Sequence, residues 1–565
     1  MKKRWKVKAA NKELQEVLGR KLEILPLTAQ LLINRGLVDC DKAFSFLRPE
    51  LKNLHDPFLL KGMDRAAERI ILAIEKRERV AVYGDYDVDG TTSTALLYLF
   101  FKEIGVDVTC YIPQRQTEGY GMNCEAVKKL SVLSINLIIT VDCGSSNHDE
   151  INYANSLGID VIVTDHHEFS KEPPAAYAVV NPKQKDCAFP FKNLAGVGVA
   201  FNLLMGIRSR LRSMGWFKNN EPNLKKYLDI VSIGTVADIV PLVDENRIFV
   251  SYGLRELENT RRPGLKALMD SVGIKPGKLD ADSIAFQIAP RINAAGRLTQ
   301  AITALRLLIT DDIREAESLA DTLNKENASR QKIEGSTLEE AMAMLGDSTD
   351  KGIVLFSEGW HPGVIGIVAS RLVDRFGKPA VMISIDGDIG KGSARGIKSF
   401  NILEGLSSCS GLLERFGGHK AAAGLTIARE NLEQFRLEFL EYLNDKIADE
   451  DLTPEIELDA EVSLGDITGR QIAEIESLSP FGCSNSEPLL CAAGADILQT
   501  EIVGTRHLRF KVKQNGSSWN GIGFNLARMH PISGEGFHIA FSPYVDEWQG
   551  TKSLRLRIRD IQATA

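Results

Sequence analysis

The 565-residue sequence lacks the features that mark secreted, membrane-spanning and zinc-binding proteins. Its eight cysteines are scattered and no two of them form a Cys-x-x-Cys pair, so neither a zinc site nor a disulfide framework is expected. No stretch approaches the roughly 18 apolar residues of a membrane span, and the basic start at Met1 is not followed by the apolar run of a signal peptide. These absences predict a soluble, cytoplasmic protein without a membrane partner.

The sequence also lacks an excess of positive charge. Its formal net charge is −7, so a nucleic acid would have to be bound by a local group of basic side chains, within a Debye length of about 8–10 Å. A Gly-x-x-x-x-Gly-Lys-Ser/Thr motif is absent, so nothing indicates ATP-driven movement. Hydrophobic residues make up 44% and charged residues 25%, as in globular proteins, and the length predicts several domains.

Short apolar runs alternate with amphipathic segments of helix length between residues 80 and 180. Strands are expected at Val80–Tyr83, Val106–Ile112, Leu137–Val141, Asp160–Thr164 and Ala178–Val180. Helices are expected between them at Thr91–Ile104, Cys124–Leu133 and Asp149–Leu157. This alternation predicts an α/β domain with a doubly wound parallel sheet.

The remainder of the chain divides into further segments. A polar-rich helical pattern over Asp311–Met344, which Gly335 could interrupt, is followed by a smaller α/β pattern and then glycine-rich loops. Alternating patterns near the end, clearest at His507–Lys513, Trp519–Phe524 and Leu554–Asp560, predict a small β-barrel of the OB type. The expected domains are a helical extension (1–60), a catalytic domain (61–310), a connecting helix (311–345), a substrate-binding domain (346–447) and an OB-like nucleic-acid-binding domain (455–565).

An acidic cluster follows the first expected strand. Asp85, Asp87 and Asp89 alternate where an apolar strand passes into a helix. Three carboxylates this close repel one another unless a cation neutralises them, which predicts a divalent metal ion. A calcium-binding EF-hand also begins D-x-D-x-D-G, but it needs a preceding helix and a Glu at the twelfth loop position, where this chain has Leu96. An EF-hand is therefore excluded.

Two further strands are expected to end in metal-ligand residues. Asp142 follows one of them, and Asp165, His166 and His167 follow the next. Because the carboxyl ends of parallel strands meet at one edge of a sheet, these side chains should lie beside the first acidic cluster. Mixed carboxylate and imidazole ligands suit Mn²⁺, with Mg²⁺ as the alternative, and this many ligands suits two ions. The sequence therefore predicts a two-metal site for phosphoryl transfer.

These motifs resemble those of the DHH phosphoesterases, which are named for the triplet Asp165-His166-His167. Further motifs lie along the chain, at Phe46–Leu51, Asp56–Asp64, Gly84–Gly90, Val141–Gly144, Gly234–Pro241, Arg291–Leu298, Trp360–Gly366, Ser393–Arg395 and Gly417–Gly424. Together they give a closer resemblance, over nearly the whole chain, to the RecJ-type single-stranded-DNA-specific exonucleases, in which the last three motifs belong to an accompanying DHHA1 domain. One departure is Ser486, at a position where that family commonly has proline, and we expect it to affect a loop and not the chemistry.

The resemblance implies roles in the acidic site. Asp238 stands before an apolar pair and a proline, where an aspartate is ordinarily a cap or turn residue, and only the resemblance makes it a ligand. Asp85 and His167 are expected to support the metals or position the attacked phosphate, and Asp165 to orient the histidines beside it. The implied metal ligands are Asp87, Asp89, Asp142, His166 and Asp238.

Basic and polar residues of the second half are candidates for holding the substrate. Three arginines (Arg291, Arg297 and Arg395) and two lysines (Lys391 and Lys398) are expected in or beside glycine-containing loops. Their charge suits phosphate oxygens, although surface ion pairs would explain these residues equally well. The two histidines could act as an acid or a phosphate donor, and Gly418 could let the backbone approach a phosphate or simply form a turn. The candidates are Arg291, Arg297, His361, Ser393, Arg395, Gly418 and His419.

The last expected strand carries three arginines at alternate positions, Arg555, Arg557 and Arg559. They would form either a solvated face of the barrel or an electrostatic track for a single strand of nucleic acid. The aromatic residues that could stack on bases of such a strand are Phe510, Trp519 and Trp548.

Three functions are compatible with these patterns. The resemblance implies a metal-dependent 5′→3′ exonuclease that hydrolyses single-stranded DNA to 5′-mononucleotides in DNA repair and recombination. It would act as a monomer, with single-strand-binding protein and a helicase as partners. The alternatives are a DHH phosphodiesterase for short oligonucleotides or cyclic dinucleotides, and a non-catalytic replication or repair scaffold. A scaffold would be expected to have lost ligands, whereas all five implied ligands are present.

Overall fold

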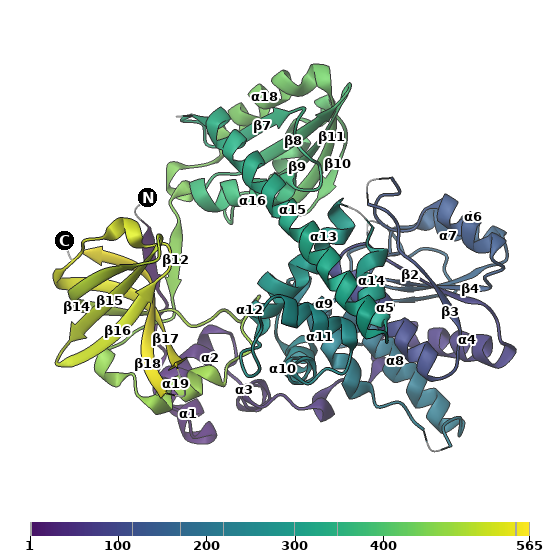
Figure 1. Ribbon diagram of the computed structural model, residues 1–565, viewed down its shortest axis with the longest axis horizontal. Helices are drawn as coiled ribbons and strands as arrows, with labels where there is room; N and C mark the ends of the chain where they lie inside the picture. The colour runs from purple at the N-terminus through teal and green to yellow at the C-terminus, as the bar shows by residue number, and fades with distance from the viewer. Residues whose placement is uncertain are drawn as a thin grey trace. The chain divides into compact units, whose positions relative to one another are not determined.

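The computed structural model describes residues 3–563 apart from residues 116, 170, 219, 299, 347, 549 and 550. The chain forms two compact units (Figure 1). The larger contains residues 6–293, 301–320 and 457–565, and the smaller contains residues 294–300 and 321–456 with the start of the chain up to Trp5. Among the described helices, none is both long enough and apolar enough to cross a membrane.

The larger unit is built on a five-stranded, entirely parallel sheet with the order β3-β2-β4-β5-β6. The inner strands are buried on both faces, as expected of strands in a parallel sheet that is covered on both sides. The strands are β2 (Val80–Gly84), β3 (Val108–Tyr111), β4 (Leu137–Val141), β5 (Asp160–Thr164) and β6 (Ala178–Val180).

Helices cover both faces of this sheet, so the predicted doubly wound α/β fold is confirmed. One face packs on α4 (Met63–Lys76), α5 (Val88–Glu103) and α8 (Gly196–Ser213). The other packs on α6 (Cys124–Val132) and α7 (His148–Ser156). Further helices complete the domain: α9 (Leu228–Ala237), α10 (Asp244–Glu258), α11 (Pro263–Ser271), α12 (Ala281–Ser283), the π-helix η4 (Ile284–Ile288), α13 (Ala289–Leu298) and α14 (Ile302–Ile309).

The larger unit also contains a closed barrel, in the strand order β14-β15-β16-β18-β17 with β17 pairing back onto β14. The predicted OB-like barrel is therefore confirmed. Its interior is shared with the N-terminal helices, because Leu18, Leu32 and Phe46 lie in the same core as Phe510 and Phe541. The elements are α1 (Lys12–Leu22), α2 (Pro26–Asn34), α3 (Cys40–Leu47), β13 (Ala460–Glu461), α19 (Gly469–Glu476), β14 (Leu490–Val503), β15 (His507–Gln514), β16 (Ser517–Gly523), β17 (Gly534–Trp548) and β18 (Thr551–Ala563).

The smaller unit holds a mixed sheet with the order β10-β11-β9-β8-β7, in which only β7 and β8 are parallel. Helix α16 packs on one face and α17 and α18 on the other. Its elements are β7 (Ile353–Ser357), α16 (Ile365–Phe376), β8 (Ala380–Asp386), β9 (Ile389–Arg395), α17 (Ile402–Ser408), β10 (Leu413–Gly418), β11 (Ala422–Ala428) and α18 (Leu432–Lys446).

The structure decides one open point and corrects one expectation. The long helix could have been interrupted at Gly335-Ser336-Thr337, but α15 (Ile313–Leu345) runs continuously through 33 residues. The glycine-rich stretch after β8 is not a set of loops, since β9, β10 and β11 are paired strands there. Glycine suits these strands because a neighbouring side chain leaves no room for a Cβ. A Cβ on Gly392 would lie 2.7 Å from the Leu425 side chain.

Candidate metal centre

The acidic cluster lies at the carboxyl end of β2 and on the first turn of α5. Asp87 is the N-cap of α5, and its side chain accepts a hydrogen bond from the Gly90 N–H at 3.0 Å. Asp89 is buried and accepts hydrogen bonds from the Gly196 and Val197 N–H groups, at 2.6 and 2.8 Å. These backbone donors hold the Asp89 carboxylate against the amino end of α8.

Asp142 and His166 follow β4 and β5 and meet this cluster. Asp142 has a φ of 60°, in the left-handed region that costs energy for residues other than glycine. The His166 Nε2 atom lies 3.1 Å from Asp142 Oδ1, 3.6 Å from Asp238 Oδ2 and 3.8 Å from Asp89 Oδ2. A Cβ at position 196 would lie 2.7 Å from Asp142 Oδ1, so only glycine leaves room for the carboxylate there.

Three groups of side chains could each hold a metal ion: Asp85, Asp87 and Asp142; Asp89, His166 and Asp238; and Asp142, His166 and His167. Ligand atoms within each group lie within 4.8 Å of one another. Four buried atoms that face this space have no hydrogen-bond partner among the described residues, namely Asp85 Oδ1, Asp142 Oδ1, His166 Nε2 and Asp238 Oδ2. Buried polar atoms rarely lack a partner, so this donor set fits divalent cations.

The pKa values of the buried side chains at this site also suit a site that binds cations. Burial, followed by the charge of Asp87, raises the pKa of Asp89 to about 7. Burial and the charges of Asp89 and Asp87 raise the pKa of Asp238 to about 9. Burial and the charge of His167 lower the pKa of His166 to about 3, which keeps its imidazole neutral, the form that binds metals.

Asp165 has a different environment from the other carboxylates. It accepts hydrogen bonds from the backbone N–H groups of Ser145, His166 and His167, and its Oδ1 lies 2.8 Å from His167 Nδ1. Burial would raise the pKa of Asp165, but the hydrogen bond and charge of His167, the charge of His166 and the Ser145 N–H together outweigh burial, and the pKa falls below its usual range. Its oxygens are therefore occupied by hydrogen bonds from Ser145, His166 and His167.

Tyr120 also lies at the site, and the sequence analysis missed it. Its hydroxyl lies 3.0 Å from His167 Nδ1 and donates to the Asp142 carbonyl at 3.2 Å. Burial would lower the pKa of His167, but the hydrogen bond and charge of Asp165 raise it. A tyrosine between glycines in Gly119-Tyr120-Gly121 was the only local signal, and it is also typical of an ordinary loop.

Four of the predicted substrate residues gather around the start of α16 in the smaller unit. Arg395 donates to Ser393 Oγ at 3.0 Å, and a Cβ on Gly366 would lie 2.8 Å from that same oxygen. Arg297 donates to the Gly363 carbonyl at 2.9 Å, and the Gly363 N–H donates to His361 Nδ1 at 3.0 Å. The cluster combines two guanidinium groups with the first turn of a helix, a combination that suits phosphate.

Four of the predicted basic residues lie on regular elements. Arg291 and Arg297 lie on helix α13 and not in a loop, Lys391 lies on strand β9, and Arg395 is the last residue of β9, beside Gly396. Gly418 and His419 stand at the turn between β10 and β11, where Gly418 has a φ of 146° and a Cβ would lie 2.4 Å from the Ala422 carbonyl. The turn by itself therefore explains the glycine.

The arginine row of β18 faces outward, and each arginine contacts a carboxylate. Arg555 lies 3.1 Å from Asp546, while Arg557 and Arg559 each lie 3.1 Å from Glu487. Among the predicted stacking residues, Phe510 is buried inside the barrel, Trp519 is partly buried, and the side chain of Trp548 lies outside the described residues. Phe510 therefore cannot stack on a base.

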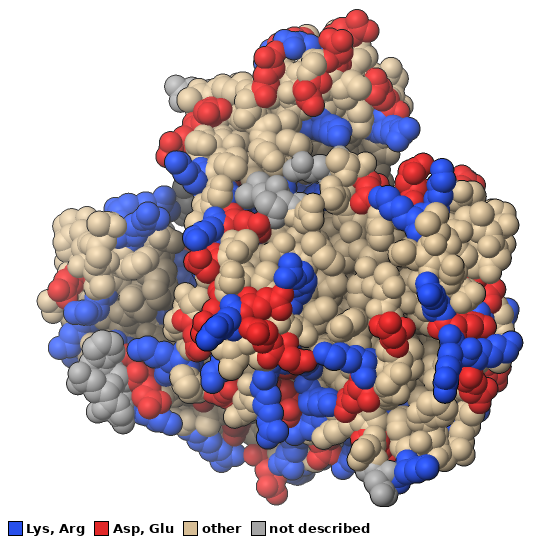
Figure 2. Space-filling view, turned by 45° about the vertical axis from the view of Figure 1, so that its right-hand side comes forward, with Lys and Arg blue, Asp and Glu red and all other residues tan. Residues whose placement is uncertain are grey.

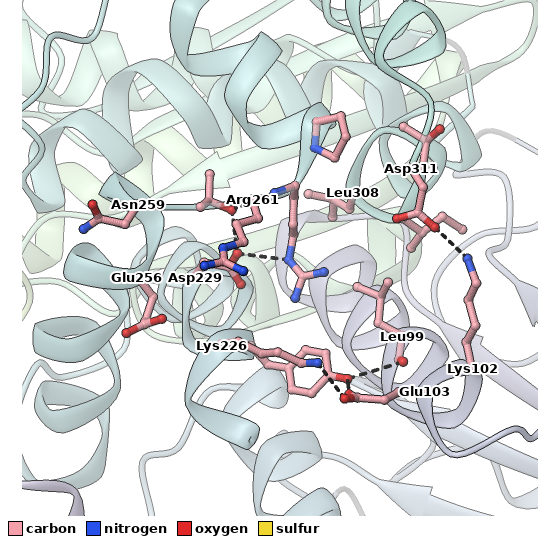
Figure 3. Close-up of a pocket in the computed structure, with 16 residues that line it drawn as sticks. Leu99, Lys102, Glu103, Lys226, Asp229, Glu256, Asn259, Arg261, Leu308 and Asp311 are labelled. Carbon is pink, nitrogen blue, oxygen red and sulfur yellow. Dashed lines mark hydrogen bonds and ion pairs between the residues drawn. The ribbon is translucent and has the colours of Figure 1, made fainter. Parts of the chain in front are cut away.

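The charged side chains around one cavity of the larger unit form ion pairs with one another. A cavity of about 670 Å³ near the end of α5 contains Lys226 against Glu103, Lys102 against Asp311 and Arg262 against Asp229, all close enough for ion pairs (Figure 3). On the molecular face of Figure 2, lysine and arginine are interspersed with aspartate and glutamate. The metal centre differs from these ion pairs, because Asp85, Asp142 and Asp238 there each keep a buried oxygen without a hydrogen-bond partner in the described part of the chain.

Three segments match known domain families: the DHH family N-terminal domain (residues 79–235), the DHHA1 domain (349–445) and the RecJ OB domain (458–560). The chain is 39% identical over 567 residues to the single-stranded-DNA-specific exonuclease RecJ of Bacillus subtilis, covering 99% of this chain and 71% of that one. The chain belongs to the RecJ family. The predicted family resemblance is thus confirmed.

Solved RecJ structures have the same fold. A crystal structure of Thermus thermophilus RecJ in complex with Mn²⁺ matches with a TM-score of 0.86 and 32% identity, covering 100% of this chain and 80% of that one. A Mg²⁺ complex of the same RecJ matches with a TM-score of 0.80 and 30% identity, covering 100% and 79%. RecJ of this fold therefore binds divalent metal ions.

Proposed function

We propose that this chain is a divalent-metal-dependent exonuclease that hydrolyses single-stranded DNA from the 5′ end to 5′-mononucleotides, in DNA repair and recombination. RecJ family membership supports the single-stranded DNA substrate. The observation that carries the chemistry is the set of buried carboxylate oxygens at this site that lack a hydrogen-bond partner among the described residues, with Asp142 Oδ1 3.1 Å from His166 Nε2. A scaffold that does not bind metal would leave these charges uncompensated, at a cost in stability.

In this proposal the metal ligands are Asp87, Asp89, Asp142, His166 and Asp238, with Asp142 placed to serve two ions because it belongs to two of the ligand groups. Asp85 belongs to one of the same groups and is a further candidate ligand. Bound divalent ions, with Mn²⁺ as the proposed species and Mg²⁺ as the alternative, would supply a water of lowered pKa and neutralise charge on the phosphate.

The surrounding residues have proposed roles of their own. Asp165 accepts from His167 Nδ1, so Nε2 is the His167 atom that remains to donate to a phosphate oxygen. The raised pKa of His167 favours the protonated form that such a donor requires. Arg291, Arg297, His361, Ser393, Arg395, Gly418 and His419 are proposed to hold the substrate, and single-strand-binding protein and a helicase are proposed partners of a monomeric enzyme.

The proposal is tested with Asp87→Ala and the control Asp107→Ala, which changes an exposed aspartate at the opposite, amino edge of the sheet. Both proteins are incubated with Mn²⁺ and with 5′-labelled single strands, 3′-labelled single strands, duplex DNA or a cyclic dinucleotide. We expect Asp87→Ala to lose digestion while keeping most of its DNA binding, and the control to release 5′-mononucleotides from single strands only. Full activity of Asp87→Ala would overturn the site, and digestion from the 3′ end would overturn the polarity.

A further inference from the structure

Asn246 lies on the first turn of α10, eight residues after Asp238, and its side chain is completely buried. Its amide nitrogen donates to two backbone carbonyls, of Asn193 at 2.6 Å and of Pro241 at 3.0 Å. Its Oδ1 atom has no hydrogen-bond partner among the described residues. Burying an unpartnered oxygen costs free energy, so the two donated hydrogen bonds are what the residue contributes.

The first of these carbonyls begins the segment that supports two ligands. The backbone of Leu194 forms a hydrogen bond with the His166 side chain. This contact is on the side of the ring away from the carboxylates, because Nε2 faces the carboxylates. The N–H groups of Gly196 and Val197 hold Asp89. A shift of this segment would therefore move both His166 and Asp89.

The second carbonyl ends the segment that carries Asp238. Between Asp238 and Pro241, Ile239 has a φ of 59° and is 73% exposed. A β-branched residue in the left-handed region is strained, so the turn persists only where surrounding contacts hold it. The hydrogen bond from Asn246 to the Pro241 carbonyl is one such contact, and the Leu242 N–H, which donates to the Cys483 carbonyl at 2.9 Å, is another.

Helix α10 is itself held firmly at this point. Glu245 accepts from the His55 N–H at 2.7 Å and from Asn202 at 3.0 Å. Arg247 donates to the carbonyls of Phe46, Leu478 and Ser479, each at 2.8 Å. Asn246 therefore reaches both segments from a fixed support.

We infer that Asn246 is a positioning residue of the metal centre, whose single amide nitrogen sets the spacing between the segment that holds Asp89 and His166 and the segment that carries Asp238. The inference rests on the proposed function, because the proposed function assigns Asp89, His166 and Asp238 as metal ligands. Loss of the amide would free the two segments to separate and would weaken metal binding without removing any ligand.

The test compares Asn246→Leu with Gln514→Leu. Gln514 is the control because its side chain is also buried and its amide nitrogen also donates to a backbone carbonyl, of Ala493 at 2.6 Å. Its hydrogen-bond partners, Ser463, Leu464 and Ala493, all belong to the barrel domain. Mn²⁺ binding to each full-length protein is measured by titration calorimetry, thermal unfolding is measured without metal, and nuclease activity is measured over a range of Mn²⁺ concentrations.

We expect both variants to lower the Tm of the metal-free protein. Only Asn246→Leu should weaken Mn²⁺ binding, by about tenfold, the lower end of the effect of residues that support metal ligands. It should raise the Mn²⁺ concentration for half-maximal activity by the same factor, with activity recovered at saturating Mn²⁺.

Equal Mn²⁺ affinity in Asn246→Leu and the parent protein would overturn the inference, as would equal weakening in Gln514→Leu. If Asn246→Leu does not fold, Asn246→Ser and Gln514→Ser, which each keep one donor, are compared by the same criterion. Failure of the parent protein to bind Mn²⁺ would instead overturn the proposed function.

Discussion

Two regions of the larger unit concentrate charge of one sign, and they differ in whether that charge is compensated. At the metal centre, Asp85, Asp142 and Asp238 each keep a buried carboxylate oxygen without a hydrogen-bond partner among the described residues. On strand β18, Arg555, Arg557 and Arg559 each lie within 3.1 Å of a carboxylate. Both regions stand out in the sequence as runs of like charge at alternate positions.

The difference shows which kind of charge cluster points to a ligand. Exposed arginines beside carboxylates are already neutralised, and water solvates what remains, so they need no further partner. Buried aspartates beside one another destabilise the folded protein unless a cation binds between them. The local balance of charge, and not the number of charged residues, therefore marks the metal centre.

The substitution Asp142→Asn should have the largest effect, because it removes one of the buried carboxylates of the metal centre. Loss of a residue that only supports a ligand costs 10–100-fold, so loss of this shared carboxylate should lower Mn²⁺-dependent nuclease activity by more than about a hundredfold. The Tm of the metal-free protein should rise, because one of several repelling carboxylates is gone. Asparagine tolerates the left-handed backbone at this position, which keeps the substitution conservative.

Calorimetry of the metal-free proteins checks the second part, with Asp107→Asn as the control at an exposed position. A lower Tm for Asp142→Asn than for the parent would mean that the carboxylates do not repel one another in the folded state.

Metal removal at different pH values gives the next largest effect. The folded-state pKa values of Asp89 and Asp238, about 7 and about 9, are raised above the unfolded value of 3.8, so the metal-free folded protein binds protons that the unfolded chain has released. The stability contributed by each group is fully present below pH 3.8 and falls as the pH rises to the folded-state pKa, about 7 for Asp89 and about 9 for Asp238, by up to about 1.4 kcal/mol per pH unit.

Mn²⁺ displaces those protons, so the stabilisation it confers should grow as the pH rises. The measurement is the difference in Tm between Mn²⁺-loaded and EDTA-treated protein at pH 6, 7 and 8. The Asp142→Asn variant should show a weaker pH dependence in EDTA. A difference that stays constant across this range would contradict the raised pKa values.

Arg557→Gln and Arg559→Gln should have the smallest effect. Glu487 forms an ion pair with both guanidinium groups, and Asp282 also interacts with both of them electrostatically. The affinity for single-stranded DNA should therefore stay within about twofold. The slope of log affinity against log salt concentration should also stay the same, whereas losing a phosphate contact would reduce it by about 0.7. Lys511→Gln serves as the comparison, since Lys511 is exposed on β15 and forms no ion pair that the structure describes.

Fluorescence anisotropy over a series of salt concentrations makes this measurement. A slope that falls by about 0.7 for each arginine variant would assign the arginine row to the DNA.

Much of the sheet and of the metal centre could be predicted from the sequence. Strands β4, β5 and β6 begin and end at the predicted residues, because buried apolar runs bounded by turn residues have few alternatives. The parallel topology then places Asp85, Asp142 and His166 at one edge of the sheet. Asp238 lies with them as the family resemblance implied, although its spacing alone did not select it.

The sequence by itself thus determined the strands, the barrel pattern and the carboxylates at the sheet edge, since these follow from local periodicity and from the direction of neighbouring strands. Only the tertiary structure decided that helices α1 to α3 complete the barrel core, that Arg247 bonds carbonyls more than 200 residues away, and that Tyr120 and Asn246 support the site. Backbone carbonyls are the same at every residue, so a side chain that bonds them leaves no pattern in the sequence.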